Sequence, residues 1–309
     1  MFPCMALHRL TTLRVGVTKM DDTREWYRQF GLTEEAPGEL ATRDGGVQLV
    51  LEEAPYRGIR HIGLGADDPD DLSRIAASLK AAGVAVEHND TLRFQDPVDN
   101  VPYEISVAPR YDADPFVLPS LNTPSEVARH DRPADSILRA NPVQPSNLTH
   151  MVRGTKDPDA SIKFHTEVLG FELSDALGGI GGFMRCGEVH HNLAVQMAEQ
   201  PFLHHISFEC DDVDEVGRGA GHMLELDADS HVWGLGRHAI GSNYFWYLKD
   251  PSGNFAEYSS DIDRISSQEA YRPKDWDNKE NLYSWGPPVP IEFLAPSDIE
   301  EVFAAMAEG

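Results

Sequence analysis

Cysteine is scarce in this sequence of 309 residues, and basic residues are outnumbered by acidic ones. The three cysteines (Cys4, Cys186 and Cys210) are odd in number and lack metal-ligand spacing, so a disulfide framework and a cysteine-based zinc site are not expected. With 51 acidic and 26 basic residues, the net charge is -25. Such a surface repels phosphate backbones and anionic membranes, so neither nucleic acid nor membrane is an expected partner.

Long hydrophobic runs are also absent. No apolar stretch approaches the roughly 20 residues that cross a bilayer, and the first residues, MFPCMALHRL, do not have the pattern of a secretion signal. Hydrophobic residues nevertheless make up 41% of the chain, which is enough for folded cores. We therefore expect a cytoplasmic globular protein, long enough for two domains.

The sequence does contain internal repeats. LTTL at 10–13, followed by DDTREWYRQFGL, matches LTHM at 148–151, followed by DPDASIKFHTEVLGF. Each segment predicts a short strand, an acidic N-cap, an amphipathic helix with aromatic residues on its inner face, and a glycine (Gly31 or Gly170) at the helix end. The two halves of the chain therefore begin in the same way.

A second pair of matches lies further along each half. His61 and His205 each open an apolar strand that runs into Asp-Asp at a predicted helix start. FQDPVDN at 94–100 then matches LKDPSGN at 248–254, and both predict a turn between strands. The chain thus holds four copies of a strand–helix–strands unit, two in each half.

This pattern resembles the vicinal oxygen chelate superfamily. The resemblance implies an α+β fold of two domains, each made of two βαβββ modules that form a curled mixed sheet around a central cavity. We expect the boundaries to be 1–138 for an N-terminal domain without a complete metal site, 139–146 for a linker, 147–262 for a catalytic domain, and 263–309 for an extension packed on it.

The same resemblance implies a metal site in the second domain, with His150, His205 and Glu257 as ligands. Two imidazoles and one carboxylate form a facial triad that leaves three adjacent positions open, and this donor set suits iron(II) and also manganese(II). His204 precedes His205, and strand alternation predicts that it lies on the opposite face of the sheet.

The first domain is expected to lack a metal. Thr12 stands where His150 stands in the second domain, and Tyr103 is expected at the position of the glutamate, with Glu104 one residue late. His61 keeps the place of the second histidine, and we interpret it as a hydrogen-bonded core residue.

Further residues resemble one branch of the superfamily. The stretch 236–258, GRHAIGSNYFWYLKDPSGNFAEY, is similar to the signature of type I extradiol dioxygenases. That signature has a histidine, an apolar run, a tyrosine, an Asp-Pro turn and the glutamate ligand in fixed order. The resemblance implies that His238 and Tyr247 hydrogen-bond the catecholate or an oxygen intermediate.

A histidine pair in VHHNLAVQ at 189–196 is the other mark of this branch. The family register, with Ala194 three residues later, selects His191 as the acid/base group beside the oxygen-binding position. A proton donor with a pKa near neutrality suits this chemistry, and histidine offers one. Alternation would place His190 on the opposite face, and we interpret it as structural.

The implied function is extradiol cleavage of a catechol by dioxygen at iron(II), in a homo-oligomer whose partners are a small aromatic diol and O₂. A metal-dependent isomerase or transferase of the same superfamily is one alternative, and a metal-free ligand-sequestering protein of the bleomycin-resistance kind is another. Several aromatic and apolar residues either line the pocket or belong to the core, which leaves mono-aromatic and biaryl catechols open: Phe183, Met184, Trp276, Tyr283 and Trp285.

Overall fold

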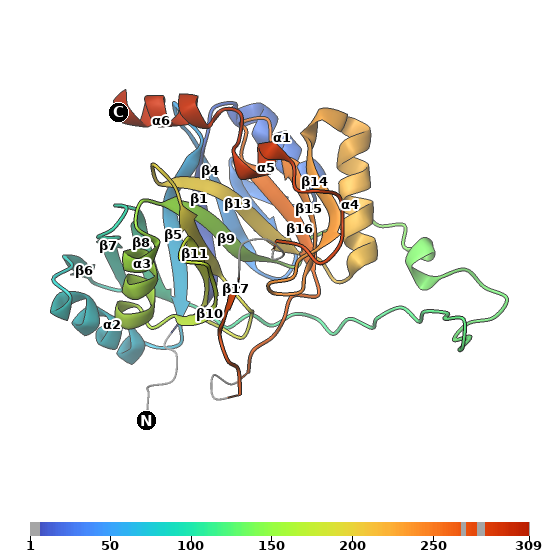
Figure 1. The fold of residues 1–309 in the computed structure, drawn as a ribbon, viewed down its shortest axis with the longest axis horizontal. Coiled ribbons are helices and arrows are strands. Elements are labelled where there is room, and N and C mark those ends of the chain that lie inside the picture. Colours follow the sequence, from blue (N-terminus) through green and yellow to red (C-terminus); the bar gives the residue numbers. More distant parts are fainter. Residues whose placement is uncertain (1–6, 267–269, 277–281, 309) are drawn as a thin grey trace.

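Two curled mixed sheets lie side by side, with helices on their outer faces (Figure 1). The computed structural model describes residues 7–266, 270–276 and 282–308. The first sheet has eight strands in the order β2-β3-β4-β1-β5-β8-β7-β6, and the second has nine in the order β14-β15-β16-β13-β9-β12-β11-β10-β17. Cys4 and the tail residues 277–281 lie outside the described residues.

The first sheet is built from two modules of one strand, one helix and three strands. The first consists of β1 (Leu7–Val17), α1 (Met20–Gln29), β2 (Thr33–Ala36), β3 (Glu39–Thr42) and β4 (Gly46–Glu53). The second consists of β5 (Gly58–Ala66), α2 (Pro69–Ala81), β6 (Val86–His88), β7 (Thr91–Gln95) and β8 (Pro102–Val107).

The second sheet repeats this order. Its first module has β9 (Asn147–Thr155), α3 (Pro158–Lys163) with a π-helical turn (Phe164–Val168), β10 (Glu172–Leu177), β11 (Gly181–Arg185) and β12 (Leu193–Met197). Its second has β13 (Phe202–Glu209), α4 (Val213–Leu226), a 3₁₀ turn (Ala228–Ser230), β14 (His231–Arg237), β15 (Tyr244–Lys249) and β16 (Phe255–Ser260). The four predicted units are confirmed.

Strand pairing follows one rule in all four modules. The first strand of each module pairs in parallel with its last strand, and the first strands of the two modules in a sheet pair antiparallel. The central strands β9 and β13 are therefore neighbours and can present side chains to the same concave face. The predicted fold class is confirmed.

Local signals explain the helix ends. The Asp68 and Asp212 side chains cap α2 and α4 by accepting from the backbone N–H three residues on, as predicted. α1 differs, because Lys19 precedes it and makes no side-chain cap. Gly31 has φ +106°, and a Cβ there would lie 2.1 Å from the Val143 carbonyl oxygen, so this helix end requires glycine.

Several buried contacts join the sheets, among them an aromatic stack and a cluster of ion pairs. The ring of Tyr258 stacks on Phe30 with centroids 3.8 Å apart, and its hydroxyl donates to the Phe30 carbonyl at 2.6 Å. Arg153 on β9 forms ion pairs with Asp96 and Asp99 of the β7–β8 turn, and all three side chains are buried. Removing one member of such a cluster leaves an uncompensated buried charge, so these contacts hold the sheets in one orientation.

The connecting segment 108–146 contains only a 3₁₀ turn (Asp135–Leu138) and runs away from the body before it returns to β9 (Figure 1). Beyond β16, β17 (Lys274–Trp276) adds in parallel to β10, and α5 (Ile291–Leu294) and α6 (Ile299–Glu308) follow. α6 is not confined to the second sheet, because Asp298 just before it pairs with Arg57 of the first half. The predicted domain boundaries stay a prediction.

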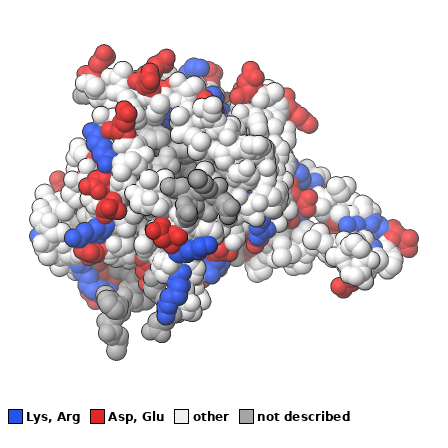
Figure 2. Space-filling model, viewed as in Figure 1, with Lys and Arg blue, Asp and Glu red and all other residues white. Residues whose placement is uncertain are grey.

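The charged side chains are not spread evenly over the face shown in Figure 2. In the view of Figure 2, the acidic and basic side chains that are drawn in colour lie mainly around the rim of the face. Within the described ranges, no helix is both long enough and apolar enough to cross a membrane.

Candidate metal centre

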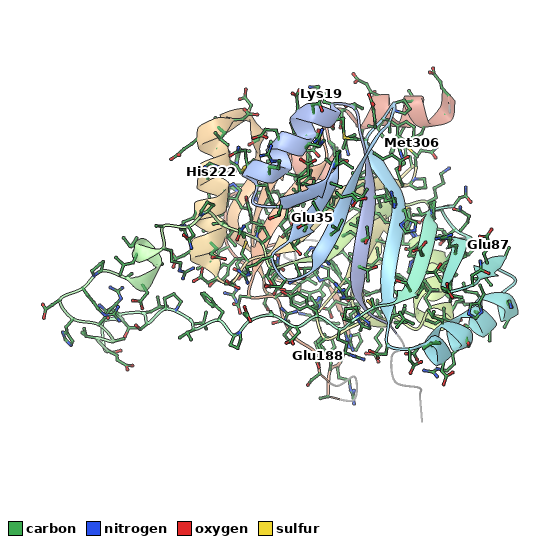
Figure 3. All side chains as sticks on the ribbon, turned by 180° about the vertical axis from the view of Figure 1, so that it is seen from behind. Lys19, Glu35, Glu87, Glu188, His222 and Met306 are labelled. Carbon is green, nitrogen blue, oxygen red and sulfur yellow. The ribbon has the colours of Figure 1, made fainter. Side chains whose placement is uncertain are left out.

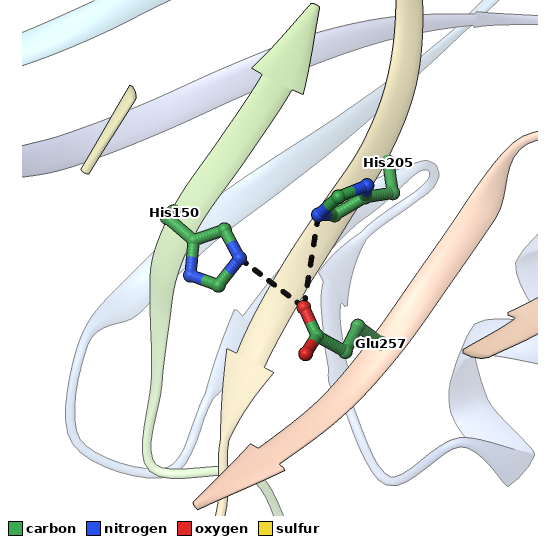
Figure 4. A group of neighbouring side chains, drawn as sticks. All are labelled: His150, His205 and Glu257. Atoms are coloured by element: carbon green, nitrogen blue, oxygen red, sulfur yellow. Dashed lines mark ion pairs between the residues drawn. The ribbon is translucent and has the colours of Figure 1, made fainter. Parts of the chain in front are cut away.

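Three strands bring His150, His205 and Glu257 together. His150 on β9 lies opposite Ser207 on β13, and Ser207 pairs in turn with Glu257 on β16. The Nε2 atoms of His150 and His205 lie 3.1 and 3.8 Å from the same Glu257 oxygen, Oε2 (Figure 4). One ligand atom from each residue falls within 4.8 Å of the others. The sequence therefore predicted a set that does converge.

The electrostatics of this cluster suit a cation. All three side chains are buried, and Glu257 Oε2 has no hydrogen-bond partner, whereas Asn243 Nδ2 donates to Oε1 at 3.1 Å. Burial lowers the pKa of His205 well below its ordinary value, so its imidazole is neutral and offers a lone pair. A buried carboxylate oxygen without a donor is costly unless a cation pairs with it. The residues present fit a divalent metal.

His204 does not lie on the opposite face, and that prediction was wrong. The pairing of β13 with β9 shifts register between Leu203 and His205, and this bulge interrupts the alternation. His204 Nδ1 lies 2.7 Å from His205 Nδ1, and His204 Nε2 lies 2.8 Å from the Phe293 carbonyl oxygen. Because a carbonyl only accepts, His204 donates through Nε2 and accepts from His205 Nδ1–H. The His205 Nε2 lone pair is then free to face Glu257.

The second histidine pair is also arranged differently from the prediction. His190 and His191 precede β12 in a loop, so strand alternation does not apply to them. Both are buried, with their Nδ1 atoms 3.0 Å apart, and the His191 ring lies 4.1 Å from the His150 ring. Burial, followed by the neighbouring histidines, lowers the pKa of His191 well below its ordinary value. The residue selected from the sequence thus lies against the triad.

His238 and Tyr247 form one hydrogen-bonded unit at the other side of the cluster. His238 Nε2 lies 2.8 Å from the Tyr247 hydroxyl, and His238 Nδ1 contacts the Leu282 carbonyl oxygen. His238 therefore donates through Nδ1 and accepts from the phenol. Burial, followed by the charge of Glu257, raises the pKa of Tyr247 well above its ordinary value, so the phenol remains protonated.

One cavity is lined by the two histidines of the triad together with His191, His204, His238 and Tyr247, and its remaining wall is apolar apart from Gln196. Phe183, Ile240 and Phe293 supply much of this wall. Of the other residues expected at the pocket or in the core, Met184 is in the core, and Tyr283 packs against Trp233. Trp276 donates to Asp175, and Trp285 is exposed.

The first sheet also has residues at the strand positions that correspond to the metal ligands of the second sheet. In the strand register, Thr12 lies opposite Gly63 as His150 lies opposite Ser207, and Gly63 pairs with Glu104 as Ser207 pairs with Glu257. Glu104, not Tyr103, is therefore the equivalent of the glutamate, and the expectation for Tyr103 was wrong. The first turn closes from Asp96 N–H to the Val101 oxygen and the second from Asp250 to Asn254, so the first is one residue longer.

The equivalent residues of the first sheet do not form a metal-binding group. Glu104 forms an ion pair with Arg93 at 2.6 Å, and Thr12 offers no imidazole. His61 is not a hydrogen-bonded core residue as expected, because it lines an open cavity and its Nδ1 has no hydrogen-bond partner. Among the described residues, only His150, His205 and Glu257 form a group able to hold a metal ion.

Some residues around the centre were missed by sequence reasoning. Asn243 holds the second oxygen of Glu257, and its only signal was a polar residue within an apolar stretch. Asp175 lies beside His190 but comes from another strand, 15 residues earlier, so no local pattern connected them.

Paired modules with one two-histidine, one-carboxylate cluster define a vicinal oxygen chelate protein. Residues 147–258 match the family model described as Glyoxalase/Bleomycin resistance protein/Dioxygenase superfamily. Over 226 residues, the chain is 30% identical to biphenyl-2,3-diol 1,2-dioxygenase of Pseudomonas sp. KKS102, covering 66% of this chain and 71% of that one. The chain belongs to the extradiol dioxygenase family of this superfamily.

Other comparisons agree with membership of the superfamily. Metapyrocatechase 2 of Cupriavidus necator is 38% identical over 154 residues, covering 49% of this chain, and the match spans about half (48%) of that relative. The crystal structure of a Mn(II)-bound glyoxalase from Novosphingobium aromaticivorans superposes with a TM-score of 0.73 at 26% identity, covering 92% of this chain and 94% of that one. Relatives at 25% identity are named as a manganese-dependent dihydroxybiphenyl dioxygenase (Geobacillus genomosp. 3) and an iron-dependent extradiol dioxygenase (Rhodococcus jostii RHA1).

Proposed function

We propose that this protein is a metal-dependent extradiol dioxygenase that opens a small catechol beside its two hydroxyls. The observation that carries the proposal is the gathering of His191, His238 and Tyr247 around the triad in one cavity. In the reaction, the ring bond next to a hydroxylated carbon and the O–O bond both break. The two oxygen atoms enter the product as a carboxylate and an aldehyde, so no reductant besides the catechol is needed.

His150, His205 and Glu257 would hold the metal, iron(II) or manganese(II). This assignment is supported by the unpartnered Glu257 oxygen and by relatives that are named for each of these metals. When bound, the metal lowers the pKa of the catechol hydroxyls and positions substrate and dioxygen together.

The surrounding residues divide the remaining work. His191, neutral because of its burial, accepts and returns a proton at a substrate oxygen. The Tyr247 hydroxyl donates its proton to His238, so its oxygen accepts a hydrogen bond from a substrate hydroxyl on the other side of the cavity. Phe183, Ile240 and Phe293 cover the ring and exclude water. The cytoplasmic location and the homo-oligomeric state inferred from the sequence remain predictions.

The isomerase alternative uses the same metal centre, and the likeness to a glyoxalase structure keeps it worth testing. Neither an isomerase nor a ligand-sequestering protein binds dioxygen. These two alternatives therefore do not explain why His191, His238 and Tyr247 share the cavity with the metal ligands.

The proposal is tested by purifying the protein anaerobically with iron(II) and supplying a panel of catechols in air. We expect one O₂ to be consumed per catechol and a yellow semialdehyde-type product, identified by absorbance and mass spectrometry. The metal-free protein should give neither. A cis,cis-muconate product, which arises by cleavage between the hydroxyls, would contradict the proposal, and so would isomerisation without oxygen uptake.

A further inference from the structure

A buried chain of hydrogen bonds runs from the C-terminal extension to His191. His190 Nδ1 lies 3.0 Å from His191 Nδ1, and its Nε2 lies 3.3 Å from Asp175 Oδ2. Asp175 in turn accepts from the backbone N–H of Lys274 at 2.8 Å and from Trp276 Nε1 at 2.9 Å, both on β17. All of Asp175, His190 and His191 are buried. No step of the reaction described above uses Asp175 or His190.

The direction of these hydrogen bonds is set by Asp175. Burial disfavours its charged form, but the donors from His190, Lys274 and Trp276 hold its pKa below the ordinary value. Asp175 is therefore a carboxylate that only accepts, and a lone pair on His190 Nε2 would face it unfavourably. His190 thus presents Nε2–H to Asp175 and to the Tyr271 hydroxyl oxygen, which also lies 3.3 Å from Nε2. With that proton on Nε2, His190 Nδ1 is the acceptor in the 3.0 Å contact and His191 Nδ1–H is the donor. His191 is left with its lone pair on Nε2.

The same arrangement occurs a second time in the centre, at His204 and His205, and there the hydrogen bonds can run in one direction only. The Phe293 carbonyl, which cannot donate, fixes His204, and His204 fixes His205 through an Nδ1–Nδ1 contact of 2.7 Å. His191 and His205 are thus each preceded in sequence by a histidine whose Nδ1 contacts their own Nδ1. The group that fixes the preceding histidine is the Asp175 carboxylate in the first pair and the Phe293 carbonyl in the second.

We propose that Asp175 and His190 are positioning residues that hold His191 in the tautomer with a free Nε2 lone pair, and that β17 of the C-terminal extension holds Asp175 in place. This inference rests on the proposed function, because it assigns a task to residues behind the proposed acid/base group. It makes the extension a part of the catalytic apparatus, and His190 is not a merely structural residue as the sequence had suggested.

Asp175→Asn is the most discriminating change, because it replaces an acceptor with a donor of the same shape. The backbone N–H of Lys274 keeps the amide oxygen at the Oδ1 position, so Nδ2–H would face His190 Nε2 and the Trp276 hydrogen bond to Oδ2 would be lost. His190 would then donate through Nδ1, and His191 would carry its proton on Nε2. Metal content and catechol affinity, measured anaerobically, should match the wild type. Turnover should fall by ~100-fold, the lower end of the effect of losing a positioned proton acceptor.

The tautomer itself can be read without activity. ¹⁵N-histidine NMR of the metal-free protein should show His191 protonated at Nδ1 in the wild type and at Nε2 in Asp175→Asn. Asp114→Asn is the matched control, since it makes the same change at an exposed carboxylate of the connecting segment 108–146, and its tautomer and turnover should match the wild type.

Three results would overturn the inference: a wild-type His191 that is protonated at Nε2, an Asp175→Asn variant with an unchanged tautomer, or a changed tautomer with normal turnover. A wild type that has the expected tautomer but opens no catechol would instead contradict the proposed function. The two failures are therefore distinguishable.

Discussion

Glu257→Gln should abolish metal binding and turnover together while the protein stays folded. The substitution keeps the shape of the side chain and removes the negative charge next to His150 and His205. Loss of an outer-shell partner already costs ~10- to 100-fold in metal affinity, so loss of the charged ligand itself should cost more than ~100-fold. Metal content by elemental analysis and oxygen uptake with catechol are the two measurements.

Stability of the metal-free protein provides a second readout for this variant. The wild type buries a carboxylate oxygen without a hydrogen-bond partner, whereas the amide buries no charge. Metal-free Glu257→Gln should therefore melt at or above the temperature of the metal-free wild type, which separates loss of the ligand from loss of the fold.

Glu104→Gln is the control for this prediction, because Glu104 occupies the equivalent strand register in the first sheet. Its metal content and activity should be those of the wild type. A Glu257→Gln protein that keeps its metal, or a Glu104→Gln protein that loses it, would show that the centre has been assigned to the wrong residues.

The second large effect is expected at His191. His191→Phe removes the proton-transferring nitrogen but retains an aromatic ring beside His150 and Phe183. Metal content and anaerobic catechol affinity should change little, while turnover falls ~100- to 10,000-fold, as for other losses of a positioned acid/base group. Single-turnover kinetics with iron-loaded protein separate the two quantities.

His222→Gln serves as the matched control for a histidine substitution, because this exposed side chain lies on α4, at the outside of the molecule (Figure 3), and does not line the cavity. Its turnover should remain within about twofold of wild type, as is usual for a surface change. If His191→Phe turns over normally, or loses its metal, its proposed acid/base role is wrong.

The repeats made much of the fold predictable. Matching strand and helix signals at Leu10 and Leu148, and again at His61 and His205, define the four modules, and an ordered run of residues is enough to place His238, Tyr247 and Glu257 on adjoining elements. These signals depend only on the order of residues along the chain. They predict the fold correctly because the first and last strands pair in the same way in each module.

Local departures from regular geometry were not predictable. A bulge at His204 and one extra residue in the turn before Tyr103 each shift the sheet register by one, and neither has a distinctive sequence. The anchors behind the two histidine pairs were also hidden, because one is the backbone carbonyl of Phe293 and the other is Asp175 on a separate strand. Both anchors are distant in the sequence from the histidines that they hold, and the fold of the second sheet brings them together.

The same fold occurs twice in this chain, and we expect only its second copy to hold the metal. Anomalous diffraction at the iron edge from crystals loaded with iron(II) tests this most directly. We expect one peak per chain, between His150, His205 and Glu257. Two peaks per chain, or a single peak beside His61 and Glu104 in the first sheet, would contradict it.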